Sequence, residues 1–184
     1  LDFGRVSVVG ILDADSMLNY PDFRAYEHAF TMMCQVSGRA GRRGDRGLVI
    51  LQTRSPQLPV VRQVGANDCD SFYRDLFAER ELFHYPPFSH LIYVFLRHKQ
   101  EPIVEAAAME LGALLRRSLA ERVLGPDKPS VARVKQMHIR KLVIKLELGA
   151  DLRAVRQLLL RTKAQLLTVK AYSSLQMFFD VDPL

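Results

Sequence analysis

Cysteine is scarce in this sequence and tryptophan is absent. Two of the 184 residues are cysteine, Cys34 and Cys69. Neither has a second cysteine or a histidine at the spacing of metal ligands, which argues against a disulfide framework and against a zinc site. We expect no metal site here, and we interpret both cysteines as free thiols in a reducing compartment.

The sequence also lacks an apolar run long enough to cross a membrane. Hydrophobic residues make up 48% and charged residues 25%, as in an ordinary globular protein. The chain begins at Leu1 inside an apolar, strand-like pattern, and no signal peptide fits that start. We therefore expect a soluble protein with no membrane partner. We also expect it to be cut from a longer chain, with one full domain or one small domain and part of another.

Positive charge is concentrated in one region. The net charge is +6, yet residues 128–170 contain eleven Lys or Arg residues against two acids, Glu147 and Asp151. The rest of the chain is slightly acidic. This clustering indicates a polyanionic partner, although a solvated face that keeps a small domain soluble would have the same composition.

The first 60 residues have the pattern of an α/β unit. Residues 6–12 and 48–53 are short, β-branched apolar runs, which predict strands buried on both faces in a parallel sheet. Between them, residues 23–37 carry apolar side chains at helical spacing, with Asp22 as the predicted N-cap. Strand, helix and strand in this order predict an α/β fold.

Two further helices are predicted, over residues 58–66 and 69–83. The prolines of Tyr85-Pro86-Pro87 end the second, so we place a domain boundary near Pro86 and treat residues 61–87 as a helical connector. Five aromatic residues here have the spacing of a core. We interpret them as a seam between domains rather than as a platform for stacking bases. They are Phe72, Phe77, Phe83, Tyr85 and Phe88.

Residues 88–184 predict a separate α+β domain. Amphipathic helical patterns alternate with period-two apolar runs, in the order β-α-β-β-α-β or a near variant. We interpret Leu124-Gly125-Pro126 as a break and Asp151 as a helix N-cap. Two helices on one face of an antiparallel sheet would form a ferredoxin-like sandwich. The expected elements are strand 90–97, helix 102–121, strand 139–148, helix 152–169 and strand 174–181.

Two arginines three residues apart lie between the first predicted helix and the second predicted strand. The segment reads Gln35-Val36-Ser37-Gly38-Arg39-Ala40-Gly41-Arg42. Guanidinium groups at this spacing in a turning backbone point the same way and can bind phosphate oxygens, while the glycines allow close approach to a neighbouring surface. The alternative is a basic loop that offsets the dipole of the preceding helix.

This segment resembles motif VI of superfamily 2 helicases, Q-x-x-G-R-x-G-R. The resemblance implies that Arg42 is the arginine finger of phosphoryl transfer and Arg39 a second γ-phosphate contact, both catalytic. It also implies that Gln35 and Gly38 belong to the nucleotide-binding segment, where Gln35 links the nucleotide to the interface between two motor lobes.

Further segments resemble one branch of these helicases, the primosomal protein N-prime (PriA) family. They imply that residues 1–60 end a second RecA-like lobe and that residues 88–184 are the C-terminal domain of a 3′-to-5′ DNA helicase. Such a helicase restarts replication at branched forks in the bacterial cytoplasm, at the nucleoid. The segments are Leu1 to Phe3, Asp13 to Asp15, Pro21 to Glu27, Gly47 to Thr53, Glu79-Arg80, Tyr85 to Phe88, Val123 to Pro126 and Asp180 to Pro183.

The sequence lacks the other half of a nucleotide site. It contains no G-x-x-x-x-G-K-[ST] loop for phosphates and no D-E-x-[HD] box for the metal. The resemblance implies that ATP and Mg²⁺ bind the intact protein, that the zinc cysteines of the family lie upstream, and that this chain begins between motifs V and VI. We therefore expect no ATPase activity from the chain alone, and no bound cofactor.

Basic residues of the predicted C-terminal domain form a stripe on the outward face of strand 139–148 and on the polar side of its second helix, with further cations in the segment that leads into the strand. Backbone phosphate is a natural ligand of such a stripe, because each neutralised phosphate releases counterions. The resemblance implies three partners: branched DNA, the acidic tail of single-strand DNA-binding protein, and other primosome proteins. The sequence leaves the choice open. The residues are Arg133, Lys135, Arg140, Lys141, Lys145, Arg153, Arg156 and Lys163.

Two alternatives remain open. The chain could be a non-catalytic nucleic-acid-binding or scaffolding module whose arginine loop contacts nucleic acid directly. Asp13 and Asp15, carboxylates at the end of a parallel strand, could bind a metal. Two acids without a third ligand are more simply interpreted as capping or turn residues.

Overall fold

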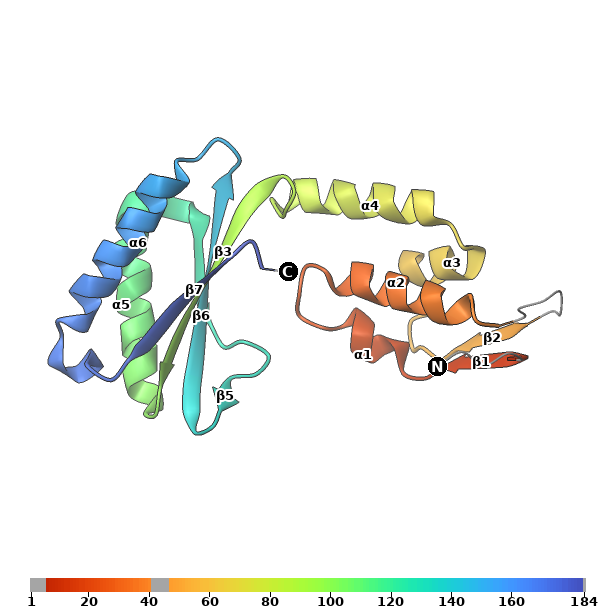
Figure 1. The fold of residues 1–184 in the computed structure, drawn as a ribbon, viewed down its shortest axis with the longest axis horizontal. Coiled ribbons are helices and arrows are strands. Elements are labelled where there is room, and N and C mark those ends of the chain that lie inside the picture. The colour runs from red at the N-terminus through yellow and green to blue at the C-terminus, as the bar shows by residue number, and fades with distance from the viewer. Residues whose placement is uncertain (1–5, 41–46, 184) are drawn as a thin grey trace. The chain divides into compact units, whose positions relative to one another are not determined.

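The computed structural model describes residues 6–40 and 47–183. Helices and strands are both present, so the predicted α/β class is confirmed. The chain divides into two compact units, Leu1–Glu79 and Arg80–Leu184 (Figure 1). Each unit has its own hydrophobic core.

The first unit contains a short parallel sheet and helices. Its elements are β1 (Val8–Ile11), α1 (Ala14–Leu18), α2 (Ala25–Ser37), β2 (Leu48–Leu51), α3 (Pro59–Ala66) and the start of α4 (Cys69–Leu82). The predicted parallel pairing of the two strands is confirmed, with Val8 opposite Leu48. The core gathers around α2 with residues from β1, α1, α3 and α4, and within it the rings of Phe30 and Phe72 stack with centroids 3.9 Å apart.

The strands of the first unit are not buried on both faces, which corrects the sequence prediction. Val8, Leu48 and Ile50 are each more than half exposed. Exposed side chains alternate along β2, which means that the described residues cover only one face of this strand. An apolar β-branched run indicates a strand, but the burial of that strand depends on what packs against it.

The helix boundaries of the first unit also differ from the prediction. The five residues of α1 are too few to show a helical period, so no sequence pattern indicated this helix. Arg24, rather than Asp22, occupies the N-cap position of α2. Asp22 instead accepts a hydrogen bond from the Arg24 backbone N–H at 2.9 Å, which forms a turn just before the helix.

The second unit is an antiparallel sheet with two helices on one face (Figure 1). Its elements are β3 (Ser89–His98), α5 (Glu101–Leu119), β4 (Val123–Asp127), β5 (Arg133–Val134), β6 (Met137–Glu147), α6 (Leu152–Leu167) and β7 (Gln176–Val181), with 3-10 turns at Ala120–Arg122 and Lys170–Tyr172. The strand order is β4-β6-β3-β7, and β5 pairs with β6. The predicted β-α-β-β-α-β order is present, with β5 added.

The core of the second unit lies between the sheet and its two helices. Val94 of β3, Leu142 of β6 and Leu115 of α5 are fully buried there. The predicted N-cap of α6 is confirmed, because the Asp151 carboxylate accepts hydrogen bonds from two backbone N–H groups of the first turn, at 2.9 and 3.1 Å.

The second strand of the predicted order, β4, had no residues assigned to it and runs through the segment that was interpreted as a break. It pairs with β6 at the edge of the sheet, with a register shift along its length. An edge position tolerates Pro126, since one side of such a strand makes no ladder hydrogen bonds. Leu148, the last residue of the predicted strand 139–148, is 60% exposed, because the strand ends one residue earlier.

Candidate nucleotide and nucleic-acid sites

The predicted nucleotide-binding segment begins at the C-terminal end of α2. Gly38 takes the C-cap position and donates its N–H to the Cys34 carbonyl at 2.9 Å. The chain continues as a turn, in which the Arg39 N–H bonds the Val36 carbonyl at 3.1 Å. Gln35, Gly38 and Arg39 are all exposed, so these predicted site residues share the surface at one helix end. Arg42, the predicted arginine finger, lies outside the described residues.

Glycine at position 38 is not required by the residues that the structure describes. Gly38 has φ −64°, which any residue adopts. An added Cβ would meet the Cys34 carbonyl oxygen at 3.4 Å, an ordinary contact. The predicted close approach of a neighbouring surface at this glycine therefore stays a prediction.

A surface cavity of about 550 Å³ opens beside the same helix end. Its walls include Ser37 and Gly38, the β2 side chains Val49 and Leu51, and Val64 of α3. The described lining residues include no cation. Phosphate binding at this helix end would therefore depend on the arginines of the segment rather than on the cavity.

Asp15 has a local structural role. Its carboxylate accepts hydrogen bonds from the Thr53 hydroxyl at 2.7 Å and the Arg54 backbone N–H at 2.8 Å, which ties α1 to the loop after β2. These two bonds lower the pKa of Asp15, the backbone bond most. Asp13 occupies the N-cap position of α1 with φ 52°. Within residues 6–40 and 47–183, no group of three potential metal-ligating side chains gathers in one place.

The basic residues predicted as one stripe do not share one surface of the second unit, and two pairs of them lie on opposite surfaces. Lys141 and Lys145 alternate with buried residues along β6, so they point away from the helices. Arg153 and Arg156 are exposed on α6, which covers the other face of the sheet. One straight DNA segment cannot contact both pairs at once.

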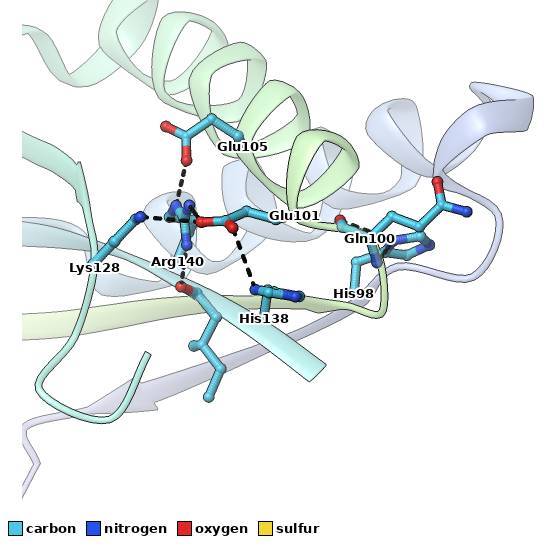
Figure 2. A network of polar contacts seen from close by, with 8 residues as sticks. His98, Gln100, Glu101, Glu105, Lys128, His138 and Arg140 are labelled. Carbon is cyan, nitrogen blue, oxygen red and sulfur yellow. Dashed lines mark hydrogen bonds and ion pairs between the residues drawn. The ribbon is translucent and has the colours of Figure 1, made fainter. Parts of the chain in front are cut away.

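Arg140 is not part of any exposed surface. Its side chain is 3% exposed, and its guanidinium binds the carboxylates of Glu101, at 2.7 Å, and Glu105 (Figure 2). Lys128 and His138 also face Glu101, at 3.0 and 3.7 Å. The guanidinium therefore ties the first turns of α5 to β6. The sequence prediction placed Arg140 among DNA-binding residues because its charge was visible and its burial was not.

Other predicted cations are also used within the second unit. The Lys145 Nζ donates to the Phe83 carbonyl at 2.7 Å and lies 3.7 Å from the Tyr85 ring centroid, and burial lowers its pKa. The Lys163 Nζ donates to the Met177 carbonyl at 2.8 Å. Both ammonium groups therefore have partners inside the unit.

Arg133 and Lys135 are exposed at the hairpin of β5 and β6. Its turn residues Lys135 and Gln136 have φ of 46° and 63°, a conformation uncommon for residues other than glycine. This hairpin is a third basic surface of the unit, beside those of β6 and α6.

Aromatic residues missed by the sequence analysis lie on the open sheet face. Tyr93, Phe95 and Phe178 are half-buried and carry the cations Arg97 and Lys141 against their rings. Alternation of Tyr93 and Phe95 within one strand was the available signal.

The aromatic residues that were predicted as a seam differ among themselves. Phe72 lies in the first core, whereas Phe77 and Phe83 are 44% and 52% exposed. Helical spacing alone therefore did not distinguish core rings from surface rings in this segment.

Residues 81–184 match the family described as Primosomal protein N C-terminal domain, which covers more than half of the chain. The chain belongs to this family. The resemblance inferred from the sequence is thereby confirmed.

Several relatives of this chain are named Replication restart protein PriA. The protein from Treponema pallidum is 42% identical over 146 residues, which cover 78% of the chain and 22% of the relative. The protein from Synechocystis is 32% identical over 190 residues, which cover 100% of the chain and 21% of the relative. The protein from Bacillus subtilis is 34% identical over 157 residues, which cover 84% of the chain and 20% of the relative. The chain thus spans about a fifth of the length of these relatives. In residues 6–40 and 47–183, no helix is long and apolar enough to cross a membrane.

Proposed function

We propose that this chain is the C-terminal portion of an ATP-dependent 3′-to-5′ DNA helicase that acts in replication restart. The observation that carries the proposal is the family match over residues 81–184, together with relatives named for replication restart. In this proposal the helicase works in the bacterial cytoplasm, at the nucleoid, on stalled or branched forks.

The first unit contributes the motif VI arginines to an ATP site that the rest of the longer protein completes. In support, Gln35 and Arg39 are exposed at the end of α2, beside a parallel pair of strands, as the end of a RecA-like lobe requires. In the intact protein, Arg42 and Arg39 would neutralise charge on the γ-phosphate, with Mg²⁺ held by residues outside this chain.

The second unit binds DNA or protein partners. Its element order and its strand order β4-β6-β3-β7 support a ferredoxin-like sandwich. Arg153 and Arg156 on α6, and Arg133 and Lys135 on the β5-β6 hairpin, are exposed cations that suit phosphates or an acidic peptide. Branched DNA, the acidic tail of single-strand DNA-binding protein and other primosome proteins are the proposed partners.

The arginine finger is tested by Arg42→Ala in the longer protein. We expect DNA-stimulated ATP hydrolysis to fall by about 10³-fold or more, because the transition-state charge loses its partner, while fork binding stays nearly unchanged. Arg62→Ala, at an exposed arginine of α3 in the same unit, should change neither. If fork binding fell together with ATPase activity, the arginine loop would be a nucleic-acid contact, and the non-catalytic binding module would replace this proposal.

The α6 surface is tested by reversing both of its exposed charges, Arg153→Glu with Arg156→Glu. The affinity for forked DNA or for an acidic-tail peptide should fall, and the salt dependence of DNA binding should flatten by about one unit of slope for each phosphate that is no longer neutralised. Arg117→Glu on α5 is a matched control at another exposed helix position. Unchanged binding of both ligands would contradict the assignment of this surface.

A further inference from the structure

Three aromatic side chains share the sheet face that α5 and α6 leave uncovered. Tyr93 and Phe95 are two residues apart on β3, and Phe178 of β7 pairs directly with Phe95. Residues two apart on a strand, and residues directly opposite in an antiparallel pair, point to the same face. Val94 of β3 points to the other face, toward the helices, whereas Leu91, on the same face as Tyr93, is also buried, so the open part of this face begins at Tyr93.

The three rings form a connected group. The Tyr93 and Phe95 centroids are 6.1 Å apart in an edge-to-face arrangement, and those of Phe95 and Phe178 are 5.3 Å apart with planes 22° from parallel. Each side chain is half-buried. The neighbouring strands therefore hold the rings in place, while each of the three residues keeps part of its surface exposed.

Two cations lie on the same rings. The Arg97 guanidinium carbon is 4.4 Å from the Phe178 centroid, and the Lys141 Nζ is 4.1 Å from the Tyr93 centroid. In the described part of the chain, neither cation forms an ion pair with a carboxylate. The acids of this region, Asp180 opposite Tyr93 and Asp127 opposite Lys141, are exposed on the two edge strands. The centre of the face therefore combines aromatic rings with positive charge.

This combination suits unpaired nucleotides better than a duplex. Base stacking on an aromatic ring contributes to affinity for every base, because every base has a π-face, and nearby cations reach the backbone phosphates. In a duplex, the base faces are covered by neighbouring base pairs. The α6 surface has cations but no aromatic residue in its sequence, so it can contact phosphates without stacking.

We propose that this face binds single-stranded nucleic acid, with unpaired bases stacked on Tyr93, Phe95 and Phe178 and with phosphates bound by Arg97 and Lys141. The inference rests on the proposed nucleic-acid-binding function of the second unit, and it assigns the open sheet face to the unpaired strand of a branched substrate.

The test measures binding by the 184-residue chain with three fluorescein-labelled probes. They are an oligothymidylate of about 12 nucleotides, an abasic oligomer of equal length, and a blunt duplex. Tyr93→Leu and Phe178→Leu remove a ring but keep apolar volume, and thermal melts confirm that the variants remain folded. We expect each to weaken oligothymidylate binding about tenfold, with little effect on the other two probes. Tyr93→Phe should retain affinity, and so should Tyr20→Leu, a control at an aromatic residue that is 58% exposed in the first unit.

A second readout does not depend on variants. Photocrosslinking with 5-iododeoxyuridine in the oligomer should modify peptides that contain residues 89–98 or 176–181. Crosslinks confined to α6 or to the β5-β6 hairpin would overturn the proposal, as would equal losses for the abasic and thymidylate probes.

The outcomes separate this inference from the proposed function. If the α6 charge reversal weakens duplex or fork binding but loss of the rings leaves oligothymidylate binding unchanged, the sheet-face site is wrong and the proposed function stands. If the chain binds no nucleic acid at all, its proposed DNA-binding role fails, and the sheet-face site fails with it.

Discussion

The two units of this chain contain similar apolar runs but differ in how completely those runs are buried. In the second unit, β3 and β6 are 10 and 11 residues long, and two helices cover the side chains on one face of these strands. In the first unit, β1 and β2 have four residues each, and Val8, Leu48 and Ile50 are 55%, 55% and 54% exposed.

This difference indicates how each unit obtains its stability. The second unit has the strands and helices needed to cover one face of its sheet, so its core depends on its own residues. The first unit presents a parallel pair of strands with an exposed apolar face, whereas parallel sheets are normally covered on both faces. The first unit therefore leaves apolar strand surface uncovered by the residues that the structure describes.

Separating the units is the change with the largest expected effect. Residues 80–184 alone should keep a cooperative thermal transition, because their core is complete, whereas residues 1–79 alone should lose theirs. Circular dichroism melts of the two fragments and of the whole chain test this. A sharp, independent transition of residues 1–79 would contradict the claim that only the second unit has a complete core.

Arg140→Met should destabilise the second unit by about 3 kcal/mol. The substitution leaves two carboxylates without their shared cation, and the loss is limited because Glu101 and Glu105 are 43% and 47% exposed and can be rehydrated. Urea denaturation measures it, with Arg156→Met as a control at an exposed arginine. Equal stability of the two variants would show that the buried network does not hold α5 to β6.

Gly125→Ala should destabilise the second unit by about 1–3 kcal/mol. Gly125 has φ 87°, and an added Cβ would lie 2.9 Å from the Lys141 carbonyl oxygen of the neighbouring strand. Gly149→Ala is the matched control, since its Cβ would meet nothing within 4 Å. Thermal melts of both variants test the difference, and an unchanged melting temperature for Gly125→Ala would show that β4 shifts without cost.

The smallest expected effect is on the pH dependence of the second unit. Hydrogen bonds from Arg140 and then Lys128 lower the pKa of Glu101 from 4.5 to about 2. Because the folded-state pKa is the lower one, the contribution of Glu101 is present above about pH 4.5 and is lost as the pH falls toward 2. The Glu101→Gln variant should therefore have a lower denaturation midpoint than the unsubstituted chain at pH 7. The two midpoints should converge near pH 2. Glu81→Gln, an exposed control, should not. A constant difference across this range would contradict the mechanism.

Local patterns were sufficient to predict most elements of the second unit. Helical periodicity predicted α5 and α6 to within a few residues, and alternation predicted β3 and β6. Asp151 was recognised as a cap because capping involves only the first turn of its own helix. The position of β4 was missed because its glycine and proline are tolerated only at the edge of a sheet, and edge position is a tertiary property.

The candidate sites were less predictable than the fold. The end of α2 was identified from the order of its residues, although Arg42 lies outside the described part of the chain. The basic stripe was wrong as a single surface. Alternation correctly placed Lys141 and Lys145 on the face of β6 that points away from the core, but it could not show that α6 covers the opposite face of the sheet. Lys141 and Arg153 are close in sequence, yet they lie on opposite sides of the second unit.

The sequence by itself determined the family, the α/β class, the periodic elements and the arginine segment, since each depends on neighbouring residues along the chain. Only the tertiary structure decided that Arg140 is buried between two carboxylates, and that Tyr93, Phe95 and Phe178 meet on one face with Arg97 and Lys141. These arrangements depend on strand order and register, which bring together residues as distant as 95 and 178 through hydrogen bonds that no local pattern specifies.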